Sequence, residues 1–88
     1  MLINTTGTGN TASGYFSLFS NLTGNYNTAN GYSALYSNNR GTYNCAYGYQ
    51  ALYSNTICTN NTAMGAQALY KALDSNNTAI GYARSTTM

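Results

Sequence analysis

The chain has 88 residues, of which three are basic and one is acidic, and its formal net charge is +2. A chain of this length forms one small domain, and so few charges argue against a surface for nucleic acid or for an anionic membrane. With no histidine and a single carboxylate side chain, Asp74, the composition also excludes paired-carboxylate and histidine-based catalysis.

Residues 1–8 are expected to form an N-terminal cap or lead-in, and a short phrase then returns five times. Its commonest form is Asn-Thr-Ala-x-Gly-Tyr, and its copies are seventeen residues apart three times and then sixteen apart. The copies begin at Asn10, Asn27, Asn44, Asn61 and Asn77. A unit this short cannot bury a core alone and must stack on its neighbours. We therefore predict an all-β, parallel β-solenoid of about five coils over residues 9–85, with a C-terminal tail at 86–88.

Within each coil, the residue types predict two strands. Threonine and tyrosine suit strands, whereas asparagine, glycine and threonine disfavour helices. The glycine marks a tight turn that needs a positive φ or a close backbone approach. The first coil is therefore expected to contain strands at about 10–13 and 16–20, a Gly-Tyr bend between them, and a polar connection. The single deletion falls between Ala72 and Asn77, in a connection that can absorb it.

Stacking at the usual strand spacing would align equivalent side chains into ladders. We expect the alanine and leucine phases to point inward and form a narrow core. These residues are Ala12, Ala29, Ala46, Ala63 and Ala79, and Leu18, Leu35, Leu52 and Leu69. The position after alanine ranges from Asn30 to Ile80, so we expect it to face outward or toward another subunit. The repeated asparagines are expected to form a further ladder.

Aromatic residues recur at two phases of the repeat, after the glycine and after the leucine. The first phase holds Tyr15, Tyr32, Tyr49 and Tyr82, and the second holds Phe19, Tyr36, Tyr53 and Tyr70. Stacked rings at strand spacing would stabilise a parallel sheet. Alternatively, the exposed tyrosines would form a platform that contacts a sugar or a protein partner. Both interpretations stay open at this point.

The two cysteines, Cys45 and Cys58, occupy different phases of the repeat. We expect unbonded thiols that are buried or half-buried, although a disulfide within the third coil is conceivable. Without histidine, a zinc site has no plausible ligand set, and neither thiol has a histidine to activate it. We therefore predict that the chain is not an enzyme and has no catalytic, cofactor or metal site.

The phrase resembles the head repeats of the trimeric autotransporter adhesins, whose coils carry an Asn-Ser-Val-Ala-Ile-Gly phrase. The most similar copy is Asn77-Thr78-Ala79-Ile80-Gly81. The repeats also resemble those of tail fibres and surface fibres of phages and large viruses. The resemblance covers Gly9 to about Ser85, and it implies a left-handed parallel β-roll in which three chains pack side by side.

The repeat and the resemblance together predict a structural or adhesive module of a cell-surface or virion fibre. As a homotrimer it would contact a host-surface glycan or protein, without nucleic acid and without membrane insertion. No secretory signal is visible at the start and no membrane span is found, so export is expected to follow another route. The alternative is an ice-binding solenoid, in which Thr11, Thr28, Thr62 and Thr78 would form a regular array.

Overall fold

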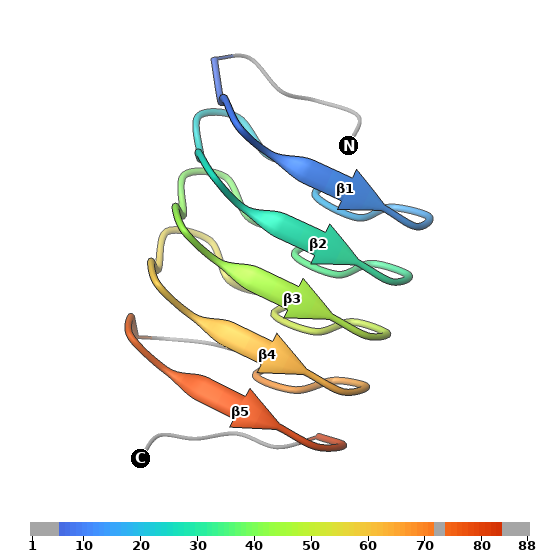
Figure 1. The fold of residues 1–88 in the computed structure, drawn as a ribbon. Coiled ribbons are helices and arrows are strands. Elements are labelled where there is room, and N and C mark those ends of the chain that lie inside the picture. Colours follow the sequence, from blue (N-terminus) through green and yellow to red (C-terminus); the bar gives the residue numbers. More distant parts are fainter. Residues whose placement is uncertain (1–5, 72–73, 84–88) are drawn as a thin grey trace.

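The computed structural model describes residues 6–71 and 74–83, which form a solenoid of about four turns that contains no helix in this part of the chain. Each coil contributes one short strand, and the strands lie one below another in a parallel sheet of order β1-β2-β3-β4-β5 (Figure 1). They are β1 (Thr11–Ser13), β2 (Thr28–Asn30), β3 (Cys45–Tyr47), β4 (Thr62–Met64) and β5 (Thr78–Ile80). The tail expected at 86–88, the last two residues of the repeat domain expected at 9–85 and most of the lead-in expected at 1–8 lie outside the described residues.

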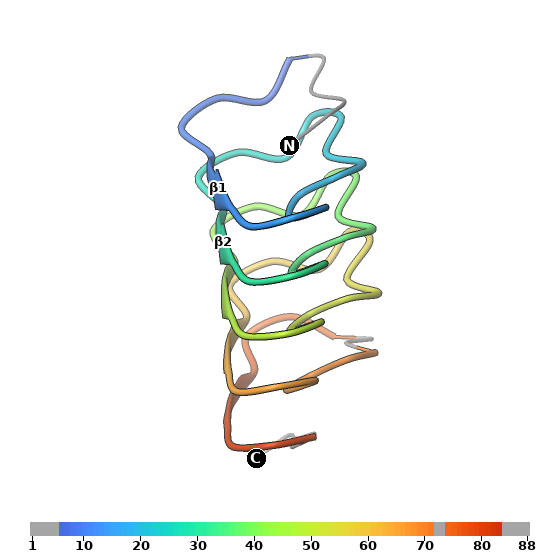
Figure 2. The ribbon, with the colours of Figure 1, turned by 90° about the vertical axis from the view of Figure 1, so that its right-hand side faces the viewer.

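The register of the sheet follows the sequence repeat. Alanine pairs with alanine at each step, and Cys45 takes the place of threonine opposite Thr28 and Thr62. Figure 2 shows that the strands form one wall of the solenoid, while the turns and connections form the rest of each coil. The deletion in the fourth connection leaves the register of β5 intact, because Thr78 still pairs with Thr62.

The second strand expected at 16–20 is wrong, since this segment forms turns in every coil that the structure describes there. Two residues in it have left-handed backbone, with φ of 63° at Phe16 and 48° at Leu18. The backbone N–H of Ser17 donates to the carbonyl of Gly14 at 3.3 Å. A positive φ at the third residue of such a turn is typical of type II. The chain therefore reverses direction here and cannot continue as an extended strand.

These turns still bond to the next coil through the backbone. The N–H of Leu35 donates to the carbonyl of Ala51 at 2.9 Å, and that of Leu52 donates to Ala68 at 3.0 Å. The hydrogen-bonded stack therefore continues beyond the strands. Leu35 and Leu52, each with a φ of 52°, are thus held to the next coil by their own N–H groups, and such backbone persists where the surrounding structure fixes it.

The repeated glycines allow the coils to approach each other closely. Gly14, Gly31, Gly48, Gly65 and Gly81 have φ between 119° and 132°. A Cβ on Gly48 would lie 2.6 Å from the carbonyl oxygen of Gly65, which is too close for any side chain. Both reasons expected from the sequence for glycine, a positive φ and close backbone approach, therefore apply at this position.

The core is a narrow column of alanine and leucine. Ala29, Ala46, Ala63 and Ala79 are buried, and so are the four leucines of the repeat. Ala12, in the first coil, is only half-buried. The residue before each leucine adds a third column, which consists of Ser17, Ala34, Ala51 and Ala68. The position after each strand alanine points to solvent.

The asparagines that precede the strands form a hydrogen-bonded ladder, which we call the strand ladder. It consists of Asn10, Asn27, Asn44, Asn61 and Asn77. The Oδ1 of each of the first four members accepts from the backbone N–H of the next asparagine at 2.8–2.9 Å. In the first four members, Nδ2 donates to a carbonyl in the connection at 2.7–3.0 Å. The amides thus satisfy backbone groups that would otherwise be buried without partners.

A second ladder runs beside it, which the sequence analysis did not predict. This turn ladder consists of Asn21, Asn38 and Asn55, all fully buried. Its members are linked from Nδ2 to Oδ1 at 2.9 Å, and each Nδ2 also donates to the carbonyl three residues further on at 3.1 Å. The two ladders join where Nδ2 of Asn61 donates to Oδ1 of Asn55 at 3.0 Å. Buried asparagine amides therefore fill much of the interior of this molecule and hydrogen-bond one coil to the next.

Ala46 and Tyr47 provide a test of the direction in which the strand side chains point. Ala46 is fully buried, whereas Tyr47 is 40% exposed. We expect Ala46→Leu to overpack the middle coil and lower the free energy of unfolding by about 1–3 kcal/mol. Tyr47→Ala should cost clearly less, and chemical denaturation of both variants measures the difference. The reverse ranking would mean that the inward and outward faces have been exchanged.

Candidate functional site

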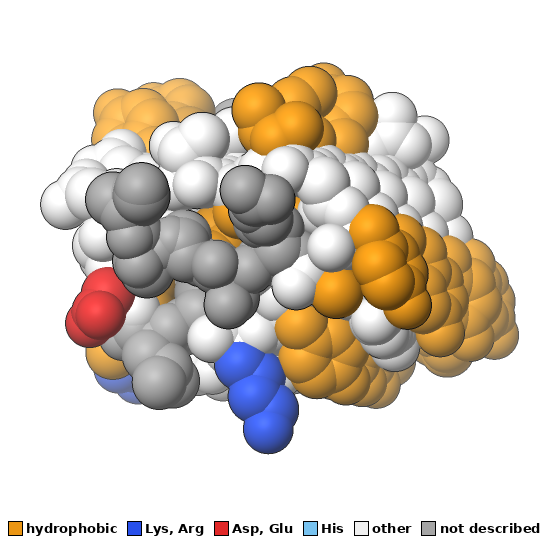
Figure 3. All heavy atoms as spheres, turned by 90° about the horizontal axis from the view of Figure 1, so that it is seen from below, with side chains coloured by type: hydrophobic (Ala, Val, Ile, Leu, Met, Phe, Trp, Pro, Cys, Tyr) orange, Lys and Arg blue, Asp and Glu red, His pale blue; other side chains and the backbone are white. Residues whose placement is uncertain are grey.

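The candidate interaction surfaces are the rows of exposed side chains that the repeat produces around the solenoid. Seen along the stack, hydrophobic side chains gather in separate groups around the coil, and charged ones are few (Figure 3). Three groups contain aromatic rings, and a fourth lies on the face of the sheet. Each group is set by one phase of the repeat.

The phase after the leucine forms the inner aromatic row, which consists of Phe19, Tyr36, Tyr53 and Tyr70. Consecutive ring centroids lie 4.9–5.1 Å apart and the planes differ by only 4–8°. All four residues are half-buried. Because each internal ring presents its faces to its neighbours in the row, these rings have little face left for a ligand. This row therefore fits the stabilising role considered for it, and not the platform role.

The phase after the glycine forms the outer tyrosine row, which consists of Tyr15, Tyr32, Tyr49 and Tyr82. These side chains are 47–77% exposed. The first three rings are tilted by 32–44° at centroid distances of 5.4 and 5.6 Å, so part of each face stays open. The fourth coil has Ala66 at this phase, and the row is interrupted there. Of the two predicted aromatic phases, this one is the better candidate for a partner.

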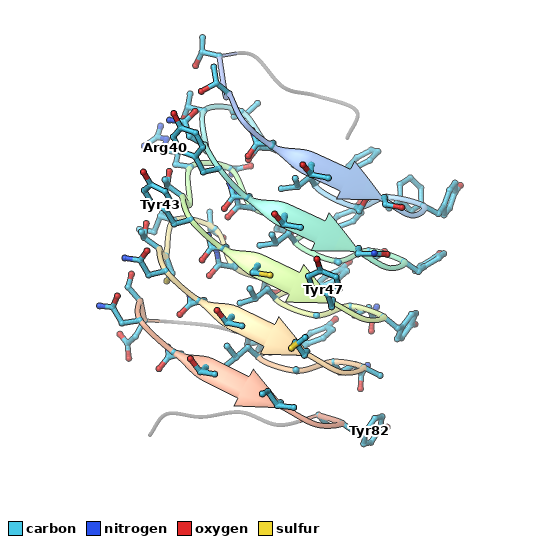
Figure 4. All side chains as sticks on the ribbon, viewed as in Figure 1. Arg40, Tyr43, Tyr47 and Tyr82 are labelled. Atoms are coloured by element: carbon cyan, nitrogen blue, oxygen red, sulfur yellow. The ribbon has the colours of Figure 1, made fainter. Side chains whose placement is uncertain are left out.

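A third aromatic group, the connection pair of Tyr26 and Tyr43, was missed by the sequence analysis. The two rings stack at 5.2 Å with planes 14° apart, and the side chains are 54% and 59% exposed. Figure 4 shows Tyr43 and Tyr82 at opposite ends of their coils. The seventeen-residue spacing of the two tyrosines could have predicted that they stack. They lie, however, in segments that were expected to be only polar connections.

The sheet presents two outward columns, because the side chains of a strand alternate between faces. The threonine column consists of Thr11, Thr28, Cys45, Thr62 and Thr78. The variable column consists of Ser13, Asn30, Tyr47, Met64 and Ile80 and changes from polar to apolar along the stack. Tyr47 projects from this face (Figure 4), and the last three members are 40%, 42% and 64% exposed. The lower half of the sheet thus carries an exposed apolar stripe.

The thiols are not suited to nucleophilic chemistry. Neither Cys45 nor Cys58 is in a disulfide; the first is half-buried and the second buried. Burial raises the pKa of the Cys45 thiol. Burial, and then the Asp74 carboxylate, raise the pKa of Cys58. A raised pKa keeps a thiol protonated, and the thiolate is the reactive form.

These raised pKa values predict a loss of stability at alkaline pH. The folded state holds the thiol protons more tightly than the unfolded chain does. The stability this contributes is therefore fully present below the ordinary thiol pKa of about 8.5, and is lost as pH rises through the folded values. Urea unfolding at a neutral pH and at two alkaline pH values should show the loss. A Cys45→Thr/Cys58→Ser variant should show a smaller loss of stability at alkaline pH. An equal loss in that variant would show that the thiols do not cause it.

The pKa of Tyr53 is raised as well, first by burial and then by its neighbours Tyr70 and Tyr36. It adds a further loss of stability of the same sign at still higher pH. This loss is expected to remain in the double-cysteine variant, which separates the two contributions.

Over residues 6–71 and 74–83, no group of three His, Cys, Asp or Glu side chains could hold a metal ion. The same part of the chain has no helix with the length and hydropathy of a membrane span. A comparison of the chain with protein-family models, with curated proteins and with solved structures found no match. The surfaces described above are therefore the basis for a functional proposal.

Proposed function

We propose that the chain is a structural and adhesive module of a cell-surface or virion fibre, acting outside the cell as a homotrimer of left-handed β-rolls. The observation that carries the proposal is the apolar stripe of Tyr47, Met64 and Ile80 on an otherwise polar sheet. Exposed apolar side chains in a contiguous row mark interaction surfaces. The resemblance of the repeat to adhesin heads and fibre repeats suggests the three-fold arrangement.

The thin core supports the same proposal. The largest fully buried apolar side chains are three leucines, Leu18, Leu35 and Leu52. A core this small supplies little stability by itself, and association is a common way for small scaffolds to bury more surface. Packing the lower half of the sheet against a second and a third copy would cover the stripe.

In such a fibre, the outer tyrosine row would provide the contact with a host-surface glycan or protein. Tyr15, Tyr32 and Tyr49 keep partly open faces in a row along the stack. Aromatic side chains with an apolar ring and a polar hydroxyl are favoured at binding surfaces. A rigid solenoid would present them at fixed spacing.

Light scattering coupled to size exclusion tests the assembly. The chain has a mass of 9.4 kDa, and we expect a particle of three times that mass. Ile80→Lys places a charge in the apolar stripe and should dissociate the particle. Ser13→Lys lies in the same column on the polar first coil and should leave the mass unchanged. A folded wild-type monomer, or an assembly indifferent to Ile80→Lys, would contradict the proposal.

The threonine column favours one alternative, an ice-binding solenoid. Thr11, Thr28, Thr62 and Thr78 project from one sheet at successive rungs, apart from the rung of Cys45. The neighbouring column is irregular, since Tyr47 and Ile80 project from it. A measurement of thermal hysteresis at millimolar protein decides this alternative, because zero activity excludes it.

A further inference from the structure

The interruption of the outer tyrosine row at Ala66 leaves a place for one ring. The backbone N–H of Gln67 donates to the carbonyl of Tyr49 at 2.6 Å, which sets Ala66 directly below Tyr49. The N–H of Ala83 donates to the carbonyl of Ala66 at 2.7 Å, which sets Tyr82 directly below Ala66. Tyr49 and Tyr82 therefore flank a small side chain from one rung above and one rung below.

The spacing of the two flanking rungs matches one aromatic ring. Two rungs separate the flanking backbones by roughly 9–10 Å. In the intact part of the row, one rung separates ring centroids by 5.4–5.6 Å. A ring placed midway would therefore meet Tyr49 and Tyr82 at about the spacing that the row already uses. Alanine at position 66 supplies no ring of its own to fill that place.

The two flanking rings are accessible to solvent, and polar side chains lie along one side of the gap. Tyr82 is 77% exposed and Tyr49 is 49% exposed. In the first coil, Phe16 lies beside the row, with its ring 4.0 Å from that of Tyr15 and 6.2 Å from that of Tyr32. Gln67 has the corresponding phase in the fourth coil, and its Nε2 is bonded to Oε1 of Gln50 at 2.8 Å. A hydrogen-bonded amide pair thus borders the gap.

We infer that Tyr49, Ala66 and Tyr82 form a slot for a single phenolic ring, supplied by a protruding tyrosine of a partner polypeptide. The ring type follows from the row itself, because a site made by removing one tyrosine from a row of tyrosines is complementary to a tyrosine. Phenolic rings combine a stacking face with a hydroxyl that can stay in water. The inference deepens the proposed function and rests on it for the partner.

Binding of p-cresol, the side chain of tyrosine in isolation, tests the slot. The probe should bind wild-type protein weakly, with a Kd on the order of millimolar. NMR shift changes should be largest at the Ala66 methyl group and the Gln67 side-chain amide. Ala66→Tyr fills the slot with a ring of the chain's own and should weaken binding at least about tenfold. Ile57→Ala, which removes a 65% exposed apolar side chain outside the tyrosine row, is the control and should leave binding unchanged.

The tyrosine source is tested with N-acetyl-tyrosinamide, which should bind like p-cresol, and with N-acetyl-leucinamide, which should bind much more weakly. Equal binding of p-cresol to wild type and Ala66→Tyr would overturn the slot. Binding of p-cresol without N-acetyl-tyrosinamide, or equal binding of methyl β-glucoside, would overturn the polypeptide ligand. Ala66→Tyr lies outside the apolar stripe, so its particle mass should be unchanged. The slot can thus fail while the trimer stands, and the reverse.

Discussion

Gly48→Ala is expected to destabilise the solenoid strongly, because it adds a methyl group where the backbones of two coils are in close contact. The new Cβ would lie 2.6 Å from the carbonyl oxygen of Gly65 and 2.7 Å from its carbonyl carbon. Neither coil can move aside easily, because the N–H of Gly48 is bonded to Asn30 and that of Gly65 to Tyr47, both at 2.8 Å. The φ of 127° adds backbone strain of about 1–3 kcal/mol, and overpacking adds about 1–3 kcal/mol.

Gly81→Ala is the matched control for this effect. Its φ of 124° is nearly that of Gly48, but a Cβ there would meet nothing within 4 Å among the described atoms. Gly81→Ala should therefore lose stability through backbone strain alone, without a steric clash. Urea denaturation of both variants measures the difference, which we expect to be about 1–3 kcal/mol. Equal losses would show that the coils are not in close contact at the glycines.

Asn44→Ala is expected to cost about as much, by breaking the strand ladder in its middle. Asn44 is 1% exposed. Its Oδ1 accepts from the N–H of Asn61 at 2.9 Å, and its Nδ2 donates to the carbonyl of Cys58 at 2.9 Å. Truncation leaves the N–H of Asn61 buried without this bond, which costs about 1–3 kcal/mol. The carbonyl of Cys58 loses one of two donors and keeps the bond from Nδ2 of Asn55 at 3.1 Å, which costs about 1 kcal/mol more. We therefore expect a loss of about 2–4 kcal/mol, measured by chemical denaturation.

Asn30→Ala, on the exposed face of the neighbouring strand, is the control and should change stability by less than about 0.5 kcal/mol. Asn44→Asp sharpens the test, since it keeps the shape and removes the donor. A carboxylate there would face the carbonyl of Cys58, so this variant should be more stable in acid, where the carboxyl group is protonated and can donate. If Asn44→Ala and Asn30→Ala lost equal stability, the ladder would have no structural importance.

The sequence repeat was enough to predict the parallel solenoid, because the register of a stack follows from the period alone. Cys45-Ala46-Tyr47 and Thr62-Ala63-Met64 have the same phase, and they pair residue by residue. Small and apolar residues at fixed phases also indicated which side chains could stack into a narrow core. The buried position of Ala46 and the exposed position of Tyr47 follow from strand alternation.

The second strand was predicted wrongly because the strand preference of threonine and tyrosine was extended to a segment that contains no threonine. Tyrosine favours strands mainly through packing, and it also adopts left-handed backbone, as at Tyr26 and Tyr43. Thirteen non-glycine residues in the described chain have positive φ, and none of them is Val, Ile or Thr. Such β-branched residues are rarely found in that conformation. Their absence from the segment around Leu18, against their presence at Thr11 and Thr28, was the signal for turns.

The surface rows could be predicted only in part. A period aligns Tyr15 with Tyr32 and Phe19 with Tyr36, but it does not say which row is exposed. That depends on the turn after the glycine, which separates Tyr15 from the half-buried Phe19. The turn ladder and the connection pair were missed for a simpler reason. They lie in polar segments, and the repetition of their asparagines and tyrosines there was given no structural meaning.

Hydrogen exchange of the asparagine side chains tests most directly the claim that buried, hydrogen-bonded amide ladders link each coil to the next. In D₂O, the Nδ2 protons of Asn27, Asn38, Asn44, Asn55 and Asn61, which are buried and hydrogen-bonded, should persist in NMR spectra. Those of the exposed Asn30 and Asn60 should vanish at once. Exchange of both sets at the same fast rate, in folded protein, would contradict the account.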